Sequence, residues 1–259
     1  MDALIGATGY VGQTLLRQRA FEHQFNSKTI GNIRDGDFGL MVCAGAPAQK
    51  WIADGNPEAD LANLKALADH LAAAKAERVI LISTVDVFPD SRGRDEGSEI
   101  DESRLTPYGA NRLWLERFVA ERFEHTLVVR LPGLVGPGLR KNAVFDFQND
   151  NNLHMIDHRA VYQFYPMVNL WADLQVAMDA GLSLVHLTAE PVSIGEVAQG
   201  GFGLDFTNVV EGRTPASYDF RTRHADLFGG AAPYQYDKRA SLTAVRAYAQ
   251  SEPRSKPLA

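Results

Sequence analysis

The sequence lacks several features that would indicate other classes of protein. Its one cysteine, Cys43, lies in an apolar run, which excludes a disulfide framework and suggests a reducing compartment. No uninterrupted apolar run approaches the ~20 residues that span a bilayer. Acidic residues outnumber basic ones, 32 to 26, and no basic patch is present, so general affinity for nucleic acid is not expected. A strand-like segment from Asp2 leaves no room for a signal peptide, and we therefore expect a soluble cytoplasmic protein without membrane partners.

The sequence instead shows short apolar runs that alternate with longer helical patterns. With 259 residues and 45% hydrophobic content, the chain can bury the core of one large α/β domain. The alternation predicts a doubly wound parallel sheet with helices on both faces. The expected strands are residues 3–7, 38–46, 78–84 and 126–131, with weaker candidates at 27–30 and 184–187, and the expected helices are 11–21, 57–75 and 107–123.

A glycine-rich loop joins the first expected strand to the first expected helix. In LIGATGYVGQTLL, Gly6, Gly9 and Gly12 have the spacing GxxGxxG. Such a turn lets the backbone approach a pyrophosphate, to which the helix N-terminus offers N–H groups and a positive dipole end. The alternative is a tight turn that only packs helix on strand. A Walker-type loop is excluded because no Gly-Lys-Ser/Thr follows.

Further motifs follow in a defined order along the chain. They are VCAGAP (42–47), Asn63 in LANLKAL, LISTVDVFPD (81–90), PYGANR (107–112), VRLPGLVGPG (129–138) and TAEPVSIGEVA (188–198). Together with the glycine loop, they resemble the extended short-chain dehydrogenase/reductase family, the NAD-dependent epimerase/dehydratase group. The resemblance spans residue 2 to about 200 and implies a Rossmann-like fold that binds NAD or NADP.

The resemblance also implies roles for individual residues. Tyr108 would be the catalytic acid/base, Thr84 the partner of the substrate oxygen, with Ser83 as the fallback, and Arg112 the charge beside Tyr108. Asn63 would be a supporting helix residue. The cofactor would contact Gly6, Ala7, Thr8, Gly9, Tyr10, Val11, Gly12, Ala44, Gly45, Ala46, Tyr108, Arg112, Leu131 and Pro132. Residues 1–135 would form the dinucleotide-binding domain and residues 136–259 a small substrate region interleaved with it.

The residue types at 108 and 112 suit this chemistry. A tyrosine base needs a pKa nearer neutrality than its usual value of about 10, and a fixed positive charge lowers that pKa. Residues at i and i+4 share one helix face, so Arg112 can lie beside Tyr108. The structural alternatives are a helix-start tyrosine behind Pro107 and a solvated arginine that pairs with Glu116 or Tyr108.

Two departures from the family pattern stand out. Arg112 replaces a lysine, and arginine is planar and larger, so the change is not conservative. In addition, only about eight residues separate Ile30 from the strand near Phe38, too few for the helix and strand that the family usually has there. We therefore expect a shortened adenosine half. Arg34 could meet a 2′-phosphate and Asp35 a 2′-hydroxyl, although both are slightly better explained as turn residues.

Other candidates are weaker. In HMIDH, the histidines 154 and 158 lack an intervening glutamate and a third ligand, so we expect no metal site. Trp171 and the aromatic residues at 162, 164 and 165 are expected to pack rather than bind. The expected helices 57–75 and 107–123 carry small or apolar residues on more than one face, including Ala62, Ala66, Leu113, Trp114 and Phe118. This pattern favours a helix-pair homodimer, the alternative being burial within the monomer.

Two functions follow as expectations. The first is an NAD(P)-dependent oxidoreductase or epimerase that acts on a nucleotide sugar, with reduction of a keto-sugar nucleotide as the alternative reaction, because STVDVFP also resembles the dTDP-4-dehydrorhamnose reductases. The second is a catalytically impaired relative that binds a nucleotide or sugar, for which Arg112 and the shortening are the reasons. An epimerase should hold its cofactor through each cycle, whereas a reductase releases it. The shortened adenosine half therefore favours a reductase.

Overall fold

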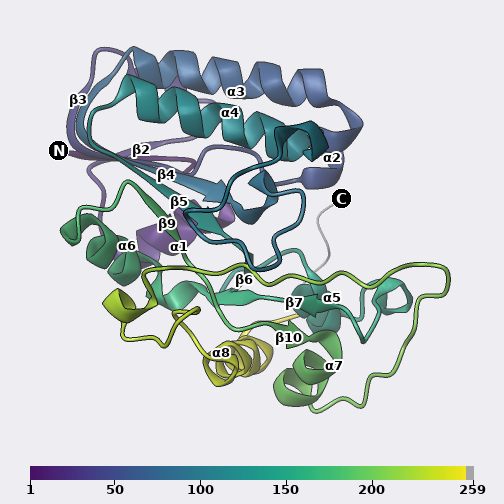
Figure 1. Ribbon diagram of the computed structural model, residues 1–259. Coiled ribbons are helices and arrows are strands. Elements are labelled where there is room, and N and C mark those ends of the chain that lie inside the picture. The colour runs from purple at the N-terminus through teal and green to yellow at the C-terminus, as the bar shows by residue number, and fades with distance from the viewer. Residues whose placement is uncertain (255–259) are drawn as a thin grey trace. The chain divides into compact units, whose positions relative to one another are not determined.

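The computed structural model describes residues 1–254, which divide into two compact units (Figure 1). The first unit contains Met1–Pro89, Gly97–Leu131 and Leu174–His186. The second contains Asp90–Glu96, Pro132–Asp173 and the described residues from Leu187 onward. None of the helices in residues 1–254 is both long enough and apolar enough to cross a bilayer.

The first unit is built on a parallel sheet in which the described residues form six strands. The order is β2-β1-β3-β4-β5-β9, and every neighbouring pair is parallel. All six strands therefore have their carboxyl ends at one edge, where open α/β sheets bind ligands. The strands are β1 (Asp2–Ile5), β2 (His23–Phe25), β3 (Asp37–Cys43), β4 (Lys75–Thr84), β5 (Thr126–Leu131) and β9 (Leu184–His186).

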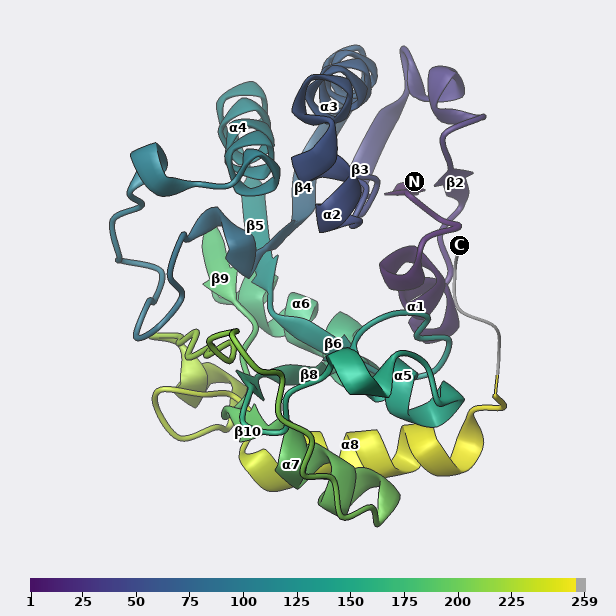
Figure 2. The same ribbon diagram turned by 90° about the vertical axis from the view of Figure 1, so that its right-hand side faces the viewer.

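Helices cover both faces of this sheet. Helices α3 (Pro57–Ala72) and α4 (Pro107–Arg122) lie side by side on one face, and α1 (Tyr10–Gln18) lies on the other (Figure 2). Between the sheet and the α3–α4 pair lies a core of fully buried side chains from both, including Met41, Leu64 and Val119. The short helix α2 (Lys50–Gly55) precedes α3. The expected α/β class and Rossmann-like parallel sheet are confirmed.

The connection between β2 and β3 is short, as the sequence indicated. Eleven residues, 26–36, hold only the 3₁₀ turn η1 (Ile30–Ile33). The order 3-2-1-4-5-6 of dinucleotide-binding folds has a further strand outside the second one; in the described residues β2 is itself the edge. The predicted strand at 27–30 is wrong: the strand is His23–Phe25, whose buried Phe25 packs in the core, whereas 27–30 form a turn that enters η1.

The second unit has smaller sheets. β6 (Gly133–Val135) pairs in parallel with β8 (Phe164–Pro166), and β7 (Val161–Tyr162) pairs antiparallel with β10 (Val192–Ser193). Helix α8 (Lys238–Ser251) packs on a π-helical turn, η6 (Ala198–Phe202). The other helices are α5 (Ala143–Asn149), α6 (Leu170–Asp179, which the unit boundary divides) and α7 (Ile194–Val197). The 3₁₀ turns at 153–155, 167–169 and 225–228 belong to this unit, and those at 85–87 and 102–104 belong to the first.

Candidate active site

The glycine loop lies at the carboxyl end of β1 and is held by close backbone contacts. Gly6 has φ +84°, and a Cβ atom on Gly12 would lie 2.1 Å from the carbonyl oxygen of Gly6. The N–H groups of Gly6 and Ala7 both donate to the carbonyl oxygen of Phe25, at 2.8 and 3.0 Å. The start of α1 therefore packs closely against the ends of β1 and β2, and position 12 has room only for glycine.

This loop fits a pyrophosphate. Gly9 is the N-cap of α1, and the first helical turn, Tyr10 to Gln13, contains uncharged residues. The N-terminus of α1 thus presents its positive dipole end without a competing carboxylate on that turn. Thr8 and Gly9 are exposed, whereas Gly6, Tyr10 and Val11 are half-buried and Ala7 and Gly12 are buried. The predicted contacts at Ala44, Gly45 and Ala46 directly follow β3, at the same sheet edge, and Leu131 ends β5, followed by Pro132.

Thr84 and Tyr108 come together at this edge of the sheet. Thr84 is the last residue of β4, and Tyr108 lies in the first turn of α4, behind Pro107. A Cβ on Gly109 would lie 2.2 Å from the carbonyl oxygen of Asp86, so glycine there lets α4 begin against the loop that follows β4. The two side chains lie near enough for the Thr84 hydroxyl to lower the pKa of the Tyr108 phenol. Thr84 and Tyr108, two of the predicted catalytic residues, therefore lie close together at this edge.

Arg112 is not the solvated helix arginine of the structural alternative. It is 3% exposed, and its Cζ lies 4.2 Å from the centroid of the Tyr108 ring. Its Nη1 donates to Oδ2 of Asp60 at 2.6 Å, and its Nη2 donates to Oδ1 of Asp60 at 3.0 Å and to the carbonyl oxygen of Pro47 at 2.5 Å. Only Nε has no partner among the described residues. Arg112 is thus near Tyr108, as expected, but its terminal nitrogens donate hydrogen bonds to Asp60 and Pro47.

Burial, rather than the charge of Arg112, has the largest effect on the pKa of Tyr108. Burial raises the pKa of Tyr108 above its ordinary value of 10, and the negative charge of Asp86 raises it further. The positive charge of Arg112 and, to a smaller extent, the Thr84 hydroxyl oppose this shift without reversing it. Arg112 therefore acts in the expected direction, but burial outweighs it, and the pKa of Tyr108 stays above its ordinary value.

Ser83 is used elsewhere. Successive strand residues point to opposite faces of the sheet, and Oγ of Ser83 donates to Oε1 of Glu116 at 2.5 Å. Glu116 in turn forms a buried ion pair with Arg130, whose Nη2 lies 2.6 Å from Oε2. His186 lies at the far side of Arg130, with its Nε2 3.4 Å from Nη1. The side chain of Ser83 belongs to this buried network, so the geometry favours Thr84 over Ser83 as the partner of Tyr108.

Arg34 and Asp35 are turn residues. Both follow η1 and lead into the amino end of β3, and Asp35 has φ +62°. The N–H of Asp35 donates to the carbonyl oxygen of Ala73, just before β4 begins. This is the sheet edge opposite the glycine loop, so neither side chain is placed to meet the ribose of a cofactor on that loop. The residues that do follow the carboxyl end of β2 are 26–29, Asn-Ser-Lys-Thr.

Asp60 is the site residue that the sequence analysis missed. It is 7% exposed and accepts hydrogen bonds from both Arg112 and Asn111, whereas Asn63, the residue expected to support the site, is exposed. The buried residues of α3 are Asp60, Leu64, Ala68 and Leu71, which form one helical stripe. A carboxylate in line with an apolar stripe needs a partner when buried. That position within the stripe was the signal available in the sequence.

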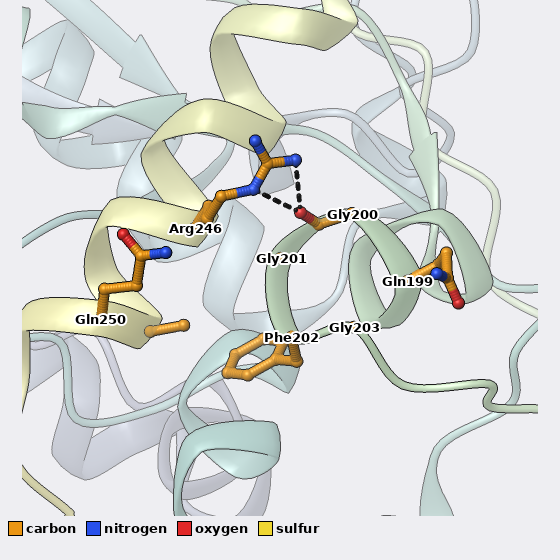
Figure 3. Close-up of a pocket in the computed structure, with 8 residues that line it drawn as sticks. Gln199, Gly200, Gly201, Phe202, Gly203, Arg246 and Gln250 are labelled. Carbon is orange, nitrogen blue, oxygen red and sulfur yellow. Dashed lines mark hydrogen bonds between the residues drawn. The ribbon is translucent and has the colours of Figure 1, made fainter.

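The other candidates do not form a site. The described residues contain no group of three or more His, Cys, Asp or Glu side chains arranged to hold a metal ion, and His154 is exposed. A hollow of about 420 Å³ lies in the second unit between η6 and α8 (Figure 3). Its one ionisable lining residue, Arg246, donates from Nε and Nη2 to the carbonyl oxygen of Gly200 at 3.0 and 2.9 Å. This hollow offers no acid, base or nucleophile.

The residues expected to pack do so to different extents. Phe164 and Tyr165 are 2% and 0% exposed, and Tyr162 is half-buried and stacks on Tyr218. Trp171 is half-buried rather than fully in the core. On the expected dimer face, Leu113 is buried within the chain, Trp114 and Phe118 are half-buried and stack on each other, and Ala62 and Ala66 are exposed. A homodimer stays a prediction.

Comparisons with known proteins support the architecture. Neither a protein-family model nor a curated protein sequence matches the chain. Among solved structures, the dTDP-4-dehydrorhamnose reductase of Clostridium acetobutylicum is 18% identical, with a TM-score of 0.69 over 96% of this chain and 99% of that one. The reductase of the same name from Bacillus anthracis, in complex with NADP, is 16% identical (TM-score 0.69, 97% and 99% covered). MoeE5, in complex with UDP-glucose and NAD, is 17% identical (TM-score 0.70, 96% and 98% covered). These matches over nearly the whole chain confirm the fold that the sequence resemblance implied.

Proposed function

We propose that the chain is an extended short-chain dehydrogenase/reductase that uses NADPH to reduce the keto group of a nucleotide-linked sugar. The observation that carries this proposal is the meeting of Thr84 and Tyr108 at the sheet edge that also holds the glycine loop. A hydroxyl and a phenol that face each other can both bond to one carbonyl oxygen, because each donates a hydrogen bond.

Tyr108 and Thr84 have distinct tasks in this reaction. The cofactor, held by the glycine loop at Gly6, Gly9 and Gly12, would supply the hydride and its two electrons for the carbonyl carbon. Thr84 Oγ1 orients the carbonyl oxygen, and Tyr108 Oη gives that oxygen its proton, so that the keto group becomes a hydroxyl and Tyr108 is left as a phenolate. Water then returns a proton to Tyr108. General acid catalysis of this kind contributes roughly 10²–10⁴-fold in rate.

Reduction is favoured over epimerisation by the state of Tyr108. An epimerase must first take a proton from an alcohol, which requires the phenolate. Burial raises the pKa of Tyr108, and so the neutral phenol is the dominant form of the protein at neutral pH. A neutral phenol is ready to donate a proton. The short β2–β3 connection also suits a cofactor that exchanges in each cycle, as a reductase requires.

The segment after β2 favours NADP over NAD. A carboxylate near the second strand end binds the ribose hydroxyls of NAD, whereas a cation nearby accommodates the 2′-phosphate of NADP. Residues 23–29, His-Gln-Phe-Asn-Ser-Lys-Thr, contain no acid, and Lys28 is exposed. The turn is fixed because Asn26 Oδ1 accepts from the N–H of Lys28 at 2.9 Å and Thr29 Oγ1 accepts from the N–H of Asn26 at 3.0 Å.

The substrate class rests on the likeness to the solved structures. Two of the similar structures are dTDP-4-dehydrorhamnose reductases, and a third holds UDP-glucose. A keto sugar joined to a nucleoside diphosphate is the substrate class that agrees with both the reductases and the UDP-glucose complex. The test is to mix the protein with NADPH and a dTDP-4-keto-6-deoxy sugar and to follow the absorbance of NADPH. Consumption of one NADPH for each alcohol formed supports the proposal, and NADPH binding without consumption over a panel of keto-sugar nucleotides argues against it.

A second function is favoured by one observation. The terminal nitrogens of Arg112 already bond to Asp60 and Pro47, so this residue has lost part of the donor capacity of the family lysine. A relative that binds a nucleotide sugar without turning it over would have this property. Such a protein would bind the nucleotide sugar equally well with Tyr108 or with phenylalanine at that position.

A further inference from the structure

The guanidinium of Arg112 lies against the face of the Tyr108 ring rather than projecting from the helix. The separation from Cζ to the ring centroid is 4.2 Å. Two ion-pair contacts to Asp60, at 2.6 and 3.0 Å, and one bond to the carbonyl oxygen of Pro47 fix its orientation. A guanidinium bound at two points by one carboxylate has little rotational freedom, because its planar fork matches the carboxylate geometry.

Asp60 is itself held in place. Asn111 Nδ2 donates to Oδ2 of Asp60 at 2.9 Å and to the carbonyl oxygen of Pro57 at 3.1 Å. Burial acts to raise the pKa of Asp60, but the hydrogen bonds from Arg112 and Asn111 together with the charge of Arg112 lower it overall. Asp60 is therefore an ionised carboxylate at neutral pH, and its charge is opposite to that of Arg112.

The other charged groups around Tyr108 do not restore an excess of positive charge. From the turn after β4, Asp86 contributes a negative charge, and Lys50 on α2 pairs with it, with Nζ 2.7 Å from Oδ1. Asp54, also on α2, accepts the backbone N–H of Tyr108 at 3.0 Å. Arg112, the cation against Tyr108, is thus paired with Asp60, and Asp86 is paired with Lys50. A pair of opposite charges acts on a nearby group much less than one isolated charge does.

We propose that Asp60 is a positioning residue: it holds Arg112 against Tyr108 and balances its charge, so that Tyr108 remains a neutral phenol and serves as a proton donor. The first part concerns the protein alone. The last part rests on the proposed function, in which the phenolic O–H bond breaks as the O–H bond of the product alcohol forms. In this chain, an arginine–aspartate pair takes the position where the family has a single lysine.

The test is an alkaline titration of the protein without cofactor, which follows tyrosine ionisation by ultraviolet difference absorbance. In Asp60→Asn, the charge of Arg112 is unbalanced, and we expect Tyr108 to ionise at least tenfold more readily, a shift of one pH unit or more to lower pH. That early step should be missing in Asp60→Asn/Tyr108→Phe, which identifies the tyrosine. As a matched control, Asp69→Asn on the exposed face of α3 should leave the curve unchanged. Coincident curves for the folded parent and Asp60→Asn overturn the proposal.

A second variant decides the matter if Asp60→Asn does not fold. Asp60→Asn/Arg112→Met removes both charges, and replacing a buried ion pair by less polar residues is often neutral for stability. If the two charges balance, Tyr108 should ionise in this variant within half a unit of the parent. A rise of one unit or more would mean that Arg112 acts as an unbalanced charge, which overturns the proposal. Neither titration depends on cofactor or substrate, so failure to bind NADPH would count against the proposed function and not against this role of Asp60.

Discussion

Asp60 and Arg112 form a two-point ion pair between α3 and α4, with side-chain exposures of 7% and 3%. Two neighbouring helices on one face of the sheet are thereby joined by charges at the end where α4 begins. Because both partners are buried, loss of one leaves the other without compensation, which typically costs about 3–5 kcal/mol. The same pair holds Arg112 against the ring of Tyr108.

The ion pair between Asp60 and Arg112 should make the free energy of unfolding depend on pH in the acidic range. The pKa of Asp60 is lowered in the folded chain, so its contribution is fully present above the ordinary aspartate pKa of about 3.9 and is lost as pH falls through the folded value. We expect Asp60→Asn to lower the free energy of unfolding by about 3 kcal/mol at pH 7. Below pH ~4 the difference from the parent should shrink. Urea unfolding at a series of pH values measures this, and a gap independent of pH would contradict the assignment.

Gly12→Ala should damage the glycine loop. The added Cβ would lie 2.1 Å from the carbonyl oxygen of Gly6, so α1 must move away from β1. Overpacking of this kind costs about 1–3 kcal/mol, and dinucleotide affinity should fall with it. Thermal unfolding and a fluorescence titration with NADPH measure the two effects. Gly55→Ala is the matched control, because a Cβ there meets nothing within 4 Å. Equal behaviour of the two variants would exclude this role for the loop.

Lys28→Ala should weaken the binding of NADPH and leave that of NADH unchanged. A hydrogen bond to a charged phosphate contributes about 1.5–3 kcal/mol, which corresponds to a loss in affinity of roughly tenfold or more. Lys65→Ala, which removes an exposed lysine from α3, should change neither affinity. Calorimetric titrations with both cofactors provide the measurement. If Lys28→Ala weakens both cofactors equally, or neither, the 2′-phosphate is bound elsewhere.

Thr84→Val should mainly lower kcat, whereas Ser83→Ala should mainly lower stability. Thr84 faces Tyr108, so its loss should reduce kcat by about tenfold or more while the protein remains folded. Ser83 donates to the buried Glu116, so its loss should cost about 1 kcal/mol of stability and leave kcat near the parent value. Turnover and urea midpoints of both variants decide this. A large loss of kcat in Ser83→Ala alone would reassign the role to Ser83.

The sequence predicted the periodic parts of the fold well. The strands at 126–131 and 184–187 and the helix at 107–123 lie within one residue of β5, β9 and α4, because their apolar patterns are regular and their ends carry Pro or polar residues. The strand β2 was misplaced because it is only three residues long, His23–Phe25, and a single buried side chain gives no period.

The site was predicted in part, and for a physical reason. Tyr108, Thr84 and Arg112 lie within short sequence motifs, so the local sequence was enough to identify them as candidates. Asp60 and Pro47 meet Arg112 only through tertiary packing, at sequence separations of 52 and 65 residues. The opposite orientations of Ser83 and Thr84 depend on the register of β4, which the sequence alone left open. Partners of a buried charge are therefore the part of this site that required the structure.

The most direct test of the account compares the parent with Tyr108→Phe in two assays, NADPH binding and reduction of a dTDP-4-keto-6-deoxy sugar. The substitution removes one hydroxyl from a ring that is 6% exposed, so the fold and the cofactor affinity should be kept. We predict equal dissociation constants for NADPH and a loss in kcat of roughly 100-fold or more, because the proton donor is gone. A variant that retains its turnover, or a parent that binds NADPH without reducing any keto-sugar nucleotide, would contradict the assignment of Tyr108 as the catalytic acid.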